Sequence, residues 1–240
     1  MVYEKKVQIT AEYSDYTIRL GNYQFFYLLQ NAMIGGFDAQ GVGNKGLREK
    51  CGGYWAVTKT KLKIFRKPDW NEEITLKAKS FDDGRLRVNV ATEILSAGNE
   101  LLALGTQELC ILDLDTHRVK RLTDTCLPLG ENKDTLAMEF EKFSMPDEIL
   151  ASYEYIVRSQ NIDMSRHVNN VEYIRMAMDL FTVDELCEKD PFVMEVHYIG
   201  ECREGEKLIC QRADAENKSF INISKDGKKV FEMKISFADK

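Results

Sequence analysis

Two kinds of hydrophobic spacing alternate along this chain. Near the start, Val7, Ile9, Ala11 and Tyr13 alternate with polar residues, as in a half-buried strand. A helical spacing follows, with apolar side chains at i, i+3, i+4, i+7 and i+8: Phe25, Leu28, Leu29, Ala32 and Met33. We expect this helix to end at Gly35-Gly36. Strand-like runs are then predicted at 55–65, 73–81, 85–95 and 100–112, with turns at 82–84 and 97–99.

The same order of elements recurs in the second half. A strand is predicted at 151–158 and a helix at 170–181, whose apolar face carries Ile174, Ala177, Met178 and Phe181. Four further strands are predicted at 192–199, 206–213, 219–224 and 229–237, and Asp226-Gly227 marks the last hairpin. Between the halves, residues 126–149 contain two of the four prolines and no strand period, which indicates a connector with room for a short helix.

An internal duplication follows from this order. Residues 15–22 lie without a gap over 163–170, and residues 61–76 lie over 195–210, which pairs Glu72 with Glu206 and Ile74 with Leu208. A strand, a helix and four more strands, twice over, predict an antiparallel sheet wrapped round a helix in each half. The expected fold is therefore α+β, a double hotdog. Its first repeat spans 1–125, its linker 126–149 and its second repeat 150–240.

Composition and charge narrow the classes of function. The chain has 240 residues, 44% of them hydrophobic, and a net charge of -6, which argues against a broad nucleic-acid surface. No apolar run approaches the roughly 18 residues of a membrane helix, and the first residues do not resemble a signal peptide. Six cysteines without a C-x-x-C pair indicate reduced thiols, so we expect a cytoplasmic protein.

Common motifs for cofactors and nucleophiles are absent or out of context in the sequence. The glycines at 41–46 match G-x-G-x-x-G, but they follow a predicted helix rather than a strand, so we expect a flexible loop. There is no G-x-S-x-G, and histidines 117, 167 and 197 share no close ligand spacing. We therefore expect neither a metal nor a bound cofactor.

The segment 161–173 concentrates groups that can do chemistry just before the second helix. Asn169 and Asn170 are good caps, and the helix N-terminus behind them favours negative charge. His167 lies beside that end, and Asp163 is close enough in sequence to orient its imidazole. The alternative is a solvated loop that only caps a helix, and local chemistry does not decide between the two.

Comparison of the halves favours an acid/base site. Arg19 stands at the position of His167, and Lys67 stands at the position of Glu201. Only the second half therefore carries both an imidazole and a carboxylate. This asymmetry indicates one active site, with the other copy serving as scaffold and pocket wall.

These residues resemble a known family. The stretch from Asp163 to Tyr173, D-M-S-R-H-V-N-N-V-E-Y, is similar to the D-x-N-x-H-V-N-N-x-x-Y of plant-type acyl-acyl carrier protein (acyl-ACP) thioesterases and their bacterial relatives. Glu201-Cys202 follows His167 by 34 residues, as the family's Glu-Cys pair does. In the first half, residues 28–32 and 55–70 resemble the family's helix and its W-V-L-x…R-Y-P-x-W stretch.

The resemblance implies hydrolysis of a long acyl chain from the phosphopantetheine thiol of ACP, which ends fatty-acid elongation, without metal or cofactor. Asp163, His167 and Glu201 would be catalytic. Glu201 with His167 would activate the water, Asp163 would hold the network, and helix N-terminal amides would stabilise the oxyanion. Asn169 and Asn170 would border the substrate.

Two neighbours of these residues leave alternatives open. Ser165 stands where the family has asparagine; the resemblance favours a polar helper, and a serine nucleophile is the alternative. Cys202 invites a thiol mechanism with His167. If 201–202 lie on a regular strand, successive side chains face opposite ways, so we expect Glu201 at the site and Cys202 buried.

Substrate and partner surfaces are less specific in the sequence. Phe25, Phe26, Leu29 and Met33 are expected to line or border the acyl site, with simple core as the alternative. Two basic clusters could dock acidic ACP, and a solvated face is the alternative for both. The better candidate for docking is Arg118, Lys120 and Arg121, whereas a solvated face is expected for Lys59, Lys61, Lys63 and Lys67. An acyl-CoA thioesterase and a non-catalytic acyl-binding protein remain alternative functions. Both a monomer and a homodimer are compatible with the duplicated sequence.

Overall fold

The computed structural model describes residues 2–82, 85–128 and 137–238. The chain forms two compact units, Met1–Glu139 and Phe140–Lys240. Within the described residues, no helix is long and apolar enough to cross a membrane.

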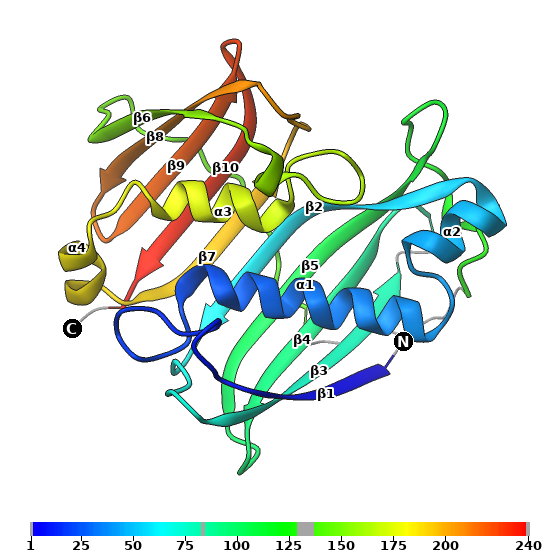
Figure 1. Ribbon diagram of the computed structural model, residues 1–240, viewed down its shortest axis with the longest axis horizontal. Helices are drawn as coiled ribbons and strands as arrows, with labels where there is room; N and C mark the ends of the chain where they lie inside the picture. The colour runs from blue at the N-terminus through cyan, green and yellow to red at the C-terminus, as the bar shows by residue number, and fades with distance from the viewer. Residues whose placement is uncertain (1, 83–84, 129–136, 239–240) are drawn as a thin grey trace. The chain divides into compact units, whose positions relative to one another are not determined.

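Unit 1 is a five-stranded antiparallel sheet with a long helix on one face (Figure 1). Its strands are β1 (Val2–Gln8), β2 (Gly53–Ile64), β3 (Glu73–Asp82), β4 (Val88–Ser96) and β5 (Leu101–Asp113). They lie in the order β1-β3-β4-β5-β2. The helices are α1 (Asn22–Ala39) and α2 (Asn44–Cys51), and the short 3-10 helix η1 (Leu122–Asp124) follows β5.

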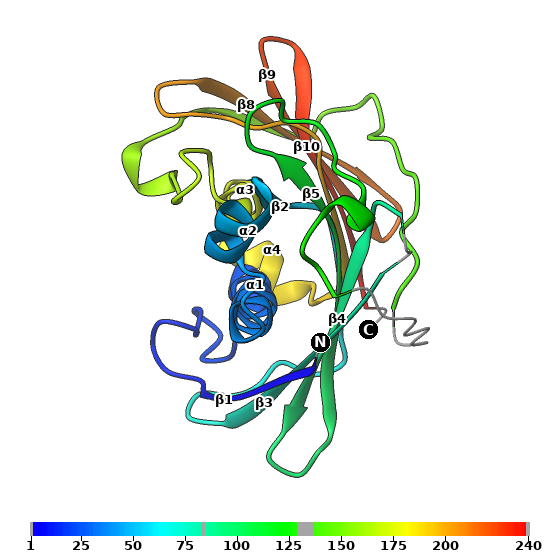
Figure 2. The same ribbon diagram turned by 90° about the vertical axis from the view of Figure 1, so that its right-hand side faces the viewer.

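Unit 2 repeats this arrangement. Its strands are β6 (Ala151–Ile156), β7 (Pro191–Tyr198), β8 (Lys207–Ala215), β9 (Lys218–Lys225) and β10 (Lys228–Phe237). They lie in the order β6-β8-β9-β10-β7, so unit 2 has the same strand order as unit 1 when the strands of each unit are numbered from its first. The helices are η2 (Ser159–Asn161), α3 (Asn170–Met178) and α4 (Val183–Glu188). Figure 2 shows that each sheet curves around its main helix, so the predicted double hotdog is confirmed.

The first strand and the first helix differ from the prediction. β1 ends at Gln8, which pairs with Glu73, the first residue of its partner β3. Residues 9 and 10 lie outside the strand, and residues 11–13 form a turn. α1 does not end at Gly35-Gly36 but continues to Ala39. A Cβ built on Gly35 would lie 2.6 Å from the Tyr3 hydroxyl oxygen, so this glycine lets the helix pack closely on β1.

The loop predicted at 41–46 is shorter than expected: only its residues 41–43 lie between α1 and α2, and α2 begins at Asn44. Gly43 is the N-cap of α2, and Gly46 lies inside that helix, where a Cβ would be 2.2 Å from the Gly41 carbonyl oxygen. Neither α2 nor α4 was predicted, because each is short and buries a single apolar residue, Leu47 and Leu186.

Two predicted connections fall partly outside the described residues. These are the turn at 82–84, of which 83–84 are not described, and the connector at 126–149, of which 129–136 are not described. The described part of the connector after 136 contains no helix.

Candidate active site

The loop that precedes α3 has its shape fixed by its own backbone. The N–H of Asp163 donates to the carbonyl of His167 at 3.0 Å, and the N–H of Arg166 donates to the carbonyl of Asp163 at 3.0 Å. Asp163 Oδ1 also accepts the N–H of Ser165 at 2.7 Å, and Arg166 takes a left-handed conformation with φ 63°. His167 is the last residue of this compact turn, and its carbonyl accepts the hydrogen bond that closes the turn.

His167 and Glu201 form the reactive pair. His167 Nε2 lies 3.2 Å from Glu201 Oε2, and the two side chains are 14% and 47% exposed. The N–H of Val168 donates to the carbonyl of Cys202 at 2.8 Å, which joins the loop to the segment between β7 and β8. The imidazole is therefore largely buried, while the carboxylate that faces it remains open to water.

Asp163 is half-buried and interacts electrostatically with both His167 and Glu201. Burial raises the pKa of its carboxyl, against a lowering effect of the Ser165 N–H and of His167. The side chain of Asp163 accepts a hydrogen bond from the backbone N–H of Ser165. The structure thus gives Asp163 a direct part in shaping the loop, while orientation of the imidazole stays a prediction.

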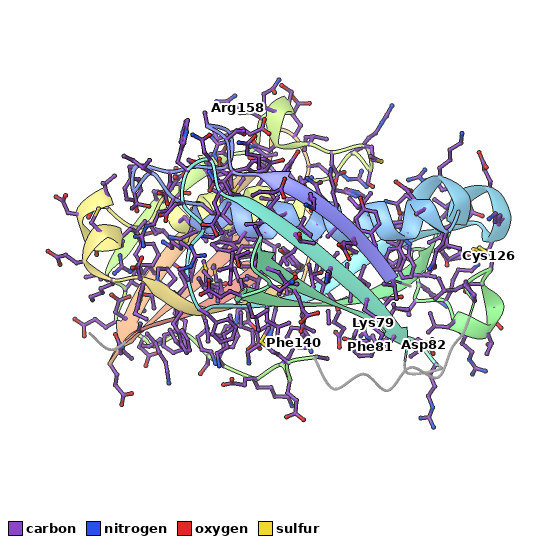
Figure 3. The ribbon with its side chains drawn as sticks, turned by 90° about the horizontal axis from the view of Figure 1, so that it is seen from below. Lys79, Phe81, Asp82, Cys126, Phe140 and Arg158 are labelled. Carbon is purple, nitrogen blue, oxygen red and sulfur yellow. The ribbon has the colours of Figure 1, made fainter. Side chains whose placement is uncertain are left out.

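The start of α3 is held by two asparagines. Asn169 Oδ1 accepts the N–H of Val171 at 2.9 Å, so Asn169 is the N-cap and Asn170 is the first helical residue. Buried Asn161 receives the N–H of Asn169 on its carbonyl, and its side chain donates to Glu172 at 2.7 Å. The backbone N–H of Arg158, labelled in Figure 3, donates to Asn161 Oδ1 at 2.8 Å. Sequence reasoning gave Asn161 no role, because its partners lie on both sides of the loop.

Arg203 is a second residue that sequence reasoning missed. Its Nη2 lies 3.4 Å from His167 Nε2, the same nitrogen that faces Glu201. A guanidinium only donates, so Arg203 places positive charge beside the imidazole and the carboxylate. The available signal was its position two residues after Glu201.

Cys202 is confirmed as a buried thiol, although the strand argument behind that prediction was wrong. β7 ends at Tyr198 and β8 begins at Lys207, so 201–202 lie on neither strand. Cys202 is nonetheless 0% exposed, and burial raises the pKa of its thiol. A buried thiol with a raised pKa is a poor nucleophile.

The four residues expected at the acyl site all lie inside unit 1. Phe25, Phe26, Leu29 and Met33 are each at most 4% exposed. Leu29 approaches the sheet where Gly105 of β5 has no side chain, since a Cβ there would lie 2.4 Å from a Leu29 methyl carbon. They form the interior between α1 and the sheet, which is compatible with both the acyl-site and the core interpretation.

The basic residues are used unequally. Arg118 and Arg121 are exposed, whereas Lys120 forms an ion pair with Asp113 at 2.8 Å. The expected solvated lysine face is wrong for two of its members, because Lys61 and Lys67 are buried. Lys61 Nζ donates to the carbonyl of Glu139 at 2.8 Å, so the connector covers this part of β2.

Comparison with known proteins places this geometry in context. Residues 145–239 match the family model of the acyl-ACP thioesterase C-terminal domain. An oleoyl-acyl carrier protein thioesterase of Arabidopsis thaliana is 21% identical over 188 residues, which cover 71% of this chain and 50% of the relative. The Coriandrum sativum enzyme of the same name is 21% identical over 184 residues, covering 70% and 49%. The chain thus spans about half the length of the curated relatives it matches.

Solved structures share the fold along the whole chain. An acyl-ACP thioesterase from Bacteroides thetaiotaomicron superposes with a TM-score of 0.86 at 17% identity, covering 99% of this chain and 98% of that one. The 12:0-ACP thioesterase from Umbellularia californica gives 0.84 at 15% identity, covering 100% and 98%. The resemblance found in the sequence is thereby confirmed: residues 145–239 match the C-terminal domain of the acyl-ACP thioesterase family, and the chain has the double hotdog fold of solved acyl-ACP thioesterases.

Proposed function

We propose that this protein is a thioesterase that hydrolyses long-chain acyl-ACP to a free fatty acid and holo-ACP, and so ends elongation. The observation that carries the proposal is the pair formed by His167 Nε2 and Glu201 Oε2, 3.2 Å apart. The family match over 145–239 supports the same reaction class.

The reaction follows from the positions of these groups. Glu201 is open to water and accepts a proton from the attacking molecule, while the adjacent imidazole of His167 shares that proton and returns it to the departing thiolate. Negative charge that develops on the thioester oxygen is stabilised by the N-terminus of α3, which carries partial positive charge. Asp163 and Asn161 keep the loop and the helix in register for this step.

The test of the base is Glu201→Gln, which keeps the size of the side chain but cannot take a proton from water. We expect kcat for release of free thiol from long-chain acyl-ACP to fall about 10²–10⁴-fold, with an unchanged circular dichroism spectrum. Cys202→Ala is the matched control at the next residue and should keep near-wild-type kcat. Wild-type turnover by Glu201→Gln would exclude the assignment, and an inactive Cys202→Ala would reinstate the thiol mechanism.

The carrier is tested by comparing acyl-ACP, acyl-CoA and a short neutral thioester. If exposed Arg118 and Arg121 attract acidic ACP, added salt should lower kcat/KM for acyl-ACP and leave the neutral thioester unchanged, because screening acts over about 8 Å at physiological salt. The double variant Arg118→Glu, Arg121→Glu should give the same loss at low salt. Equal salt responses would move docking to another face. Faster turnover of acyl-CoA would favour the CoA alternative, and binding without turnover would favour an acyl-binding protein.

A further inference from the structure

The inner face of the unit 1 sheet, which α1 covers, carries an unexpected set of polar side chains. Gly105 of β5 identifies this face, because a side chain at this position would point at Leu29 of α1. Thr92 of β4 is directly opposite Gly105, and Gln107, two residues along β5, is opposite Thr60 of β2. Side chains of opposed and of alternate residues share one face, so Thr60, Thr92 and Gln107 all point toward the helix side.

These three side chains are almost fully removed from solvent. Thr60 is 2% exposed, Thr92 is 1% exposed and Gln107 is 4% exposed. Among the residues that the structure describes, Thr92 Oγ1 and Gln107 Oε1 have no hydrogen-bond partner. A buried polar atom without a partner is costly and rare in folded proteins, so these two atoms indicate a partner that binds there.

Unit 2 shows that the fold does not require polarity at these positions. When the overlay of residues 61–76 on 195–210 is extended by one residue, Thr60 corresponds to Met194. Ile235 is opposite Met194 as Gln107 is opposite Thr60, and Ile221 is opposite Met233 as Thr92 is opposite Gly105. Met194, Ile221 and Ile235 are all at most 1% exposed. The same register is therefore apolar in the unit that carries His167 and polar in the unit that does not.

We propose that Thr92 and Gln107 form a binding site for a hydroxyl group on the acyl chain of the substrate. This inference rests on the proposed function and names the substrate class: hydroxyacyl thioesters rather than plain saturated ones. Thr92 and Gln107 are diagonal neighbours on adjacent strands, with backbones about 7–8 Å apart. The side chain of Gln107 is long enough to bring its Oε1 closer to Thr92 Oγ1. One hydroxyl can accept from Thr92 Oγ1 and donate to Gln107 Oε1, and so satisfy both atoms.

A plain hydrocarbon chain in the same place would leave both atoms unpaired. Sites built to hydrogen-bond a substrate hydroxyl discriminate strongly against analogues that lack it, for this reason. The surrounding side chains that face α1, such as Val90, Leu109 and Leu62, are buried and apolar. They would accommodate the rest of the chain, so the polar pair would select the position of the hydroxyl along it.

The test uses acyl-ACP substrates of one chain length that carry no hydroxyl or one hydroxyl at a series of positions. We expect one positional isomer to exceed the unsubstituted chain about tenfold or more in kcat/KM. Gln107→Met and Thr92→Val, which keep the size of each side chain, should reduce that ratio to about one. The controls Ile235→Val and Ile221→Val, at the corresponding positions of unit 2, should leave the ratio unchanged. If Gln107→Met and Thr92→Val keep the wild-type ratio of kcat/KM between hydroxylated and unsubstituted substrates, the proposal is overturned. If such a variant keeps the wild-type ratio and is also more stable than wild type, the pair binds only a buried water.

A binding measurement separates this inference from the proposed function. The free hydroxy acid should raise the melting temperature of the wild-type protein more than the unsubstituted acid does, and Gln107→Met should abolish the difference. That result without thioesterase activity would support the hydroxyl site and refute the proposed function. Turnover of acyl-ACP with no discrimination in either assay would refute the hydroxyl site alone.

Discussion

The loop that carries His167 has a counterpart in unit 1 with nearly the same backbone and different chemistry. In both loops an aspartate N–H donates to the carbonyl four residues later at 3.0 Å, in Asp163 to His167 and in Asp15 to Arg19. In both, the aspartate Oδ1 accepts the N–H two residues on, at 2.7 Å from Ser165 and 2.8 Å from Thr17.

The similarity extends to the segment on which each loop docks. Val168 donates to the carbonyl of Cys202 at 2.8 Å, and Leu20 donates to the carbonyl of Pro68 at 2.8 Å. The left-handed residue also recurs, as Arg166 with φ 63° and Ile18 with φ 58°. Backbone shape therefore does not distinguish the two loops.

The difference lies in the side chains placed on this common backbone. Unit 2 has His167 beside Glu201, whose carboxylate is open to water, whereas unit 1 has Arg19 and a buried Lys67 at the corresponding positions. Unit 1 therefore lacks both the imidazole and the carboxylate that would move the proton in unit 2. A hydrogen-bonded turn thus supplies position, and two substitutions decide whether that position is reactive.

The largest expected effect comes from removing the imidazole. His167→Asn should lower kcat about 10²–10⁴-fold, because an amide cannot take the proton from Glu201 and pass it to the departing thiolate. Arg19→Asn makes the same side chain at the corresponding position of unit 1, and we expect kcat within about twofold of wild type, since this half-buried residue lies outside the pair of His167 and Glu201. Kinetics of thiol release from acyl-ACP measures both variants. Equal losses would show that the two loops share the chemistry, against the comparison above.

The next effect concerns the hydroxyl on each loop. If Ser165 donates to the substrate carbonyl or to water, Ser165→Ala should lose about 1–3 kcal/mol of transition-state stabilisation, which is roughly five- to 150-fold in kcat/KM. Ser165→Asn should retain activity. Thr17 Oγ1 donates to Asp15 Oδ1 at 2.5 Å, so Thr17→Ala should affect only stability, by about 1 kcal/mol. An acyl-serine trapped and seen by mass spectrometry would instead make Ser165 a nucleophile.

The sequence predicted much of this comparison, for physical reasons. Strand alternation and turn residues such as Asp226-Gly227, where both φ angles are positive, are local signals. The overlay of 15–22 on 163–170 could be found because a duplicated turn keeps its aspartate and its spacing. Glu201 was added to His167 from the second overlay, of 61–76 on 195–210, and from the family resemblance.

Other features depend on contacts that no local pattern encodes. At Gly35, α1 packs closely on Tyr3 of β1, a residue far away in the sequence, and Arg203 is distinguished only by its place beside His167. Thr92 and Gln107 stand among other polar residues, such as Glu93 and Glu108, so nothing local marks them as facing a covered surface. Only the register of β4 on β5 shows that they share the covered face.

A smaller effect is expected from the charge of Asp163. Asp163→Asn keeps an oxygen for the Ser165 N–H, and the loss of charge near His167 should lower kcat about tenfold or less. Burial raises the pKa of this carboxyl above its unfolded value, so the wild-type protein loses stability as pH rises through the folded-state pKa. Asparagine does not ionise, so the variant should be at least as stable as wild type at neutral pH. That gain should vanish below the unfolded pKa in denaturant unfolding at several pH values. The predicted direction would be contradicted if the unfolding free energy of Asp163→Asn, relative to wild type, were lower at neutral pH than in acid.

The smallest effect on activity is expected where the two loops enter their helices. Asn169 caps α3 through its side chain, whereas α1 begins after Gly21, which offers none. Asn169→Ala should therefore cost about 1 kcal/mol of unfolding free energy, and Asn169→Gly only a few tenths. Gly21→Ala has no cap to lose and its backbone is extended, with φ -74°, but a Cβ there would lie 2.0 Å from Gln24 Oε1. Its cost should be set by how far that flexible side chain can move. Chemical denaturation of the three variants, with kcat measured in parallel, decides the point. A stability loss from Asn169→Gly as large as that from Asn169→Ala would show that the asparagine acts through something other than the cap.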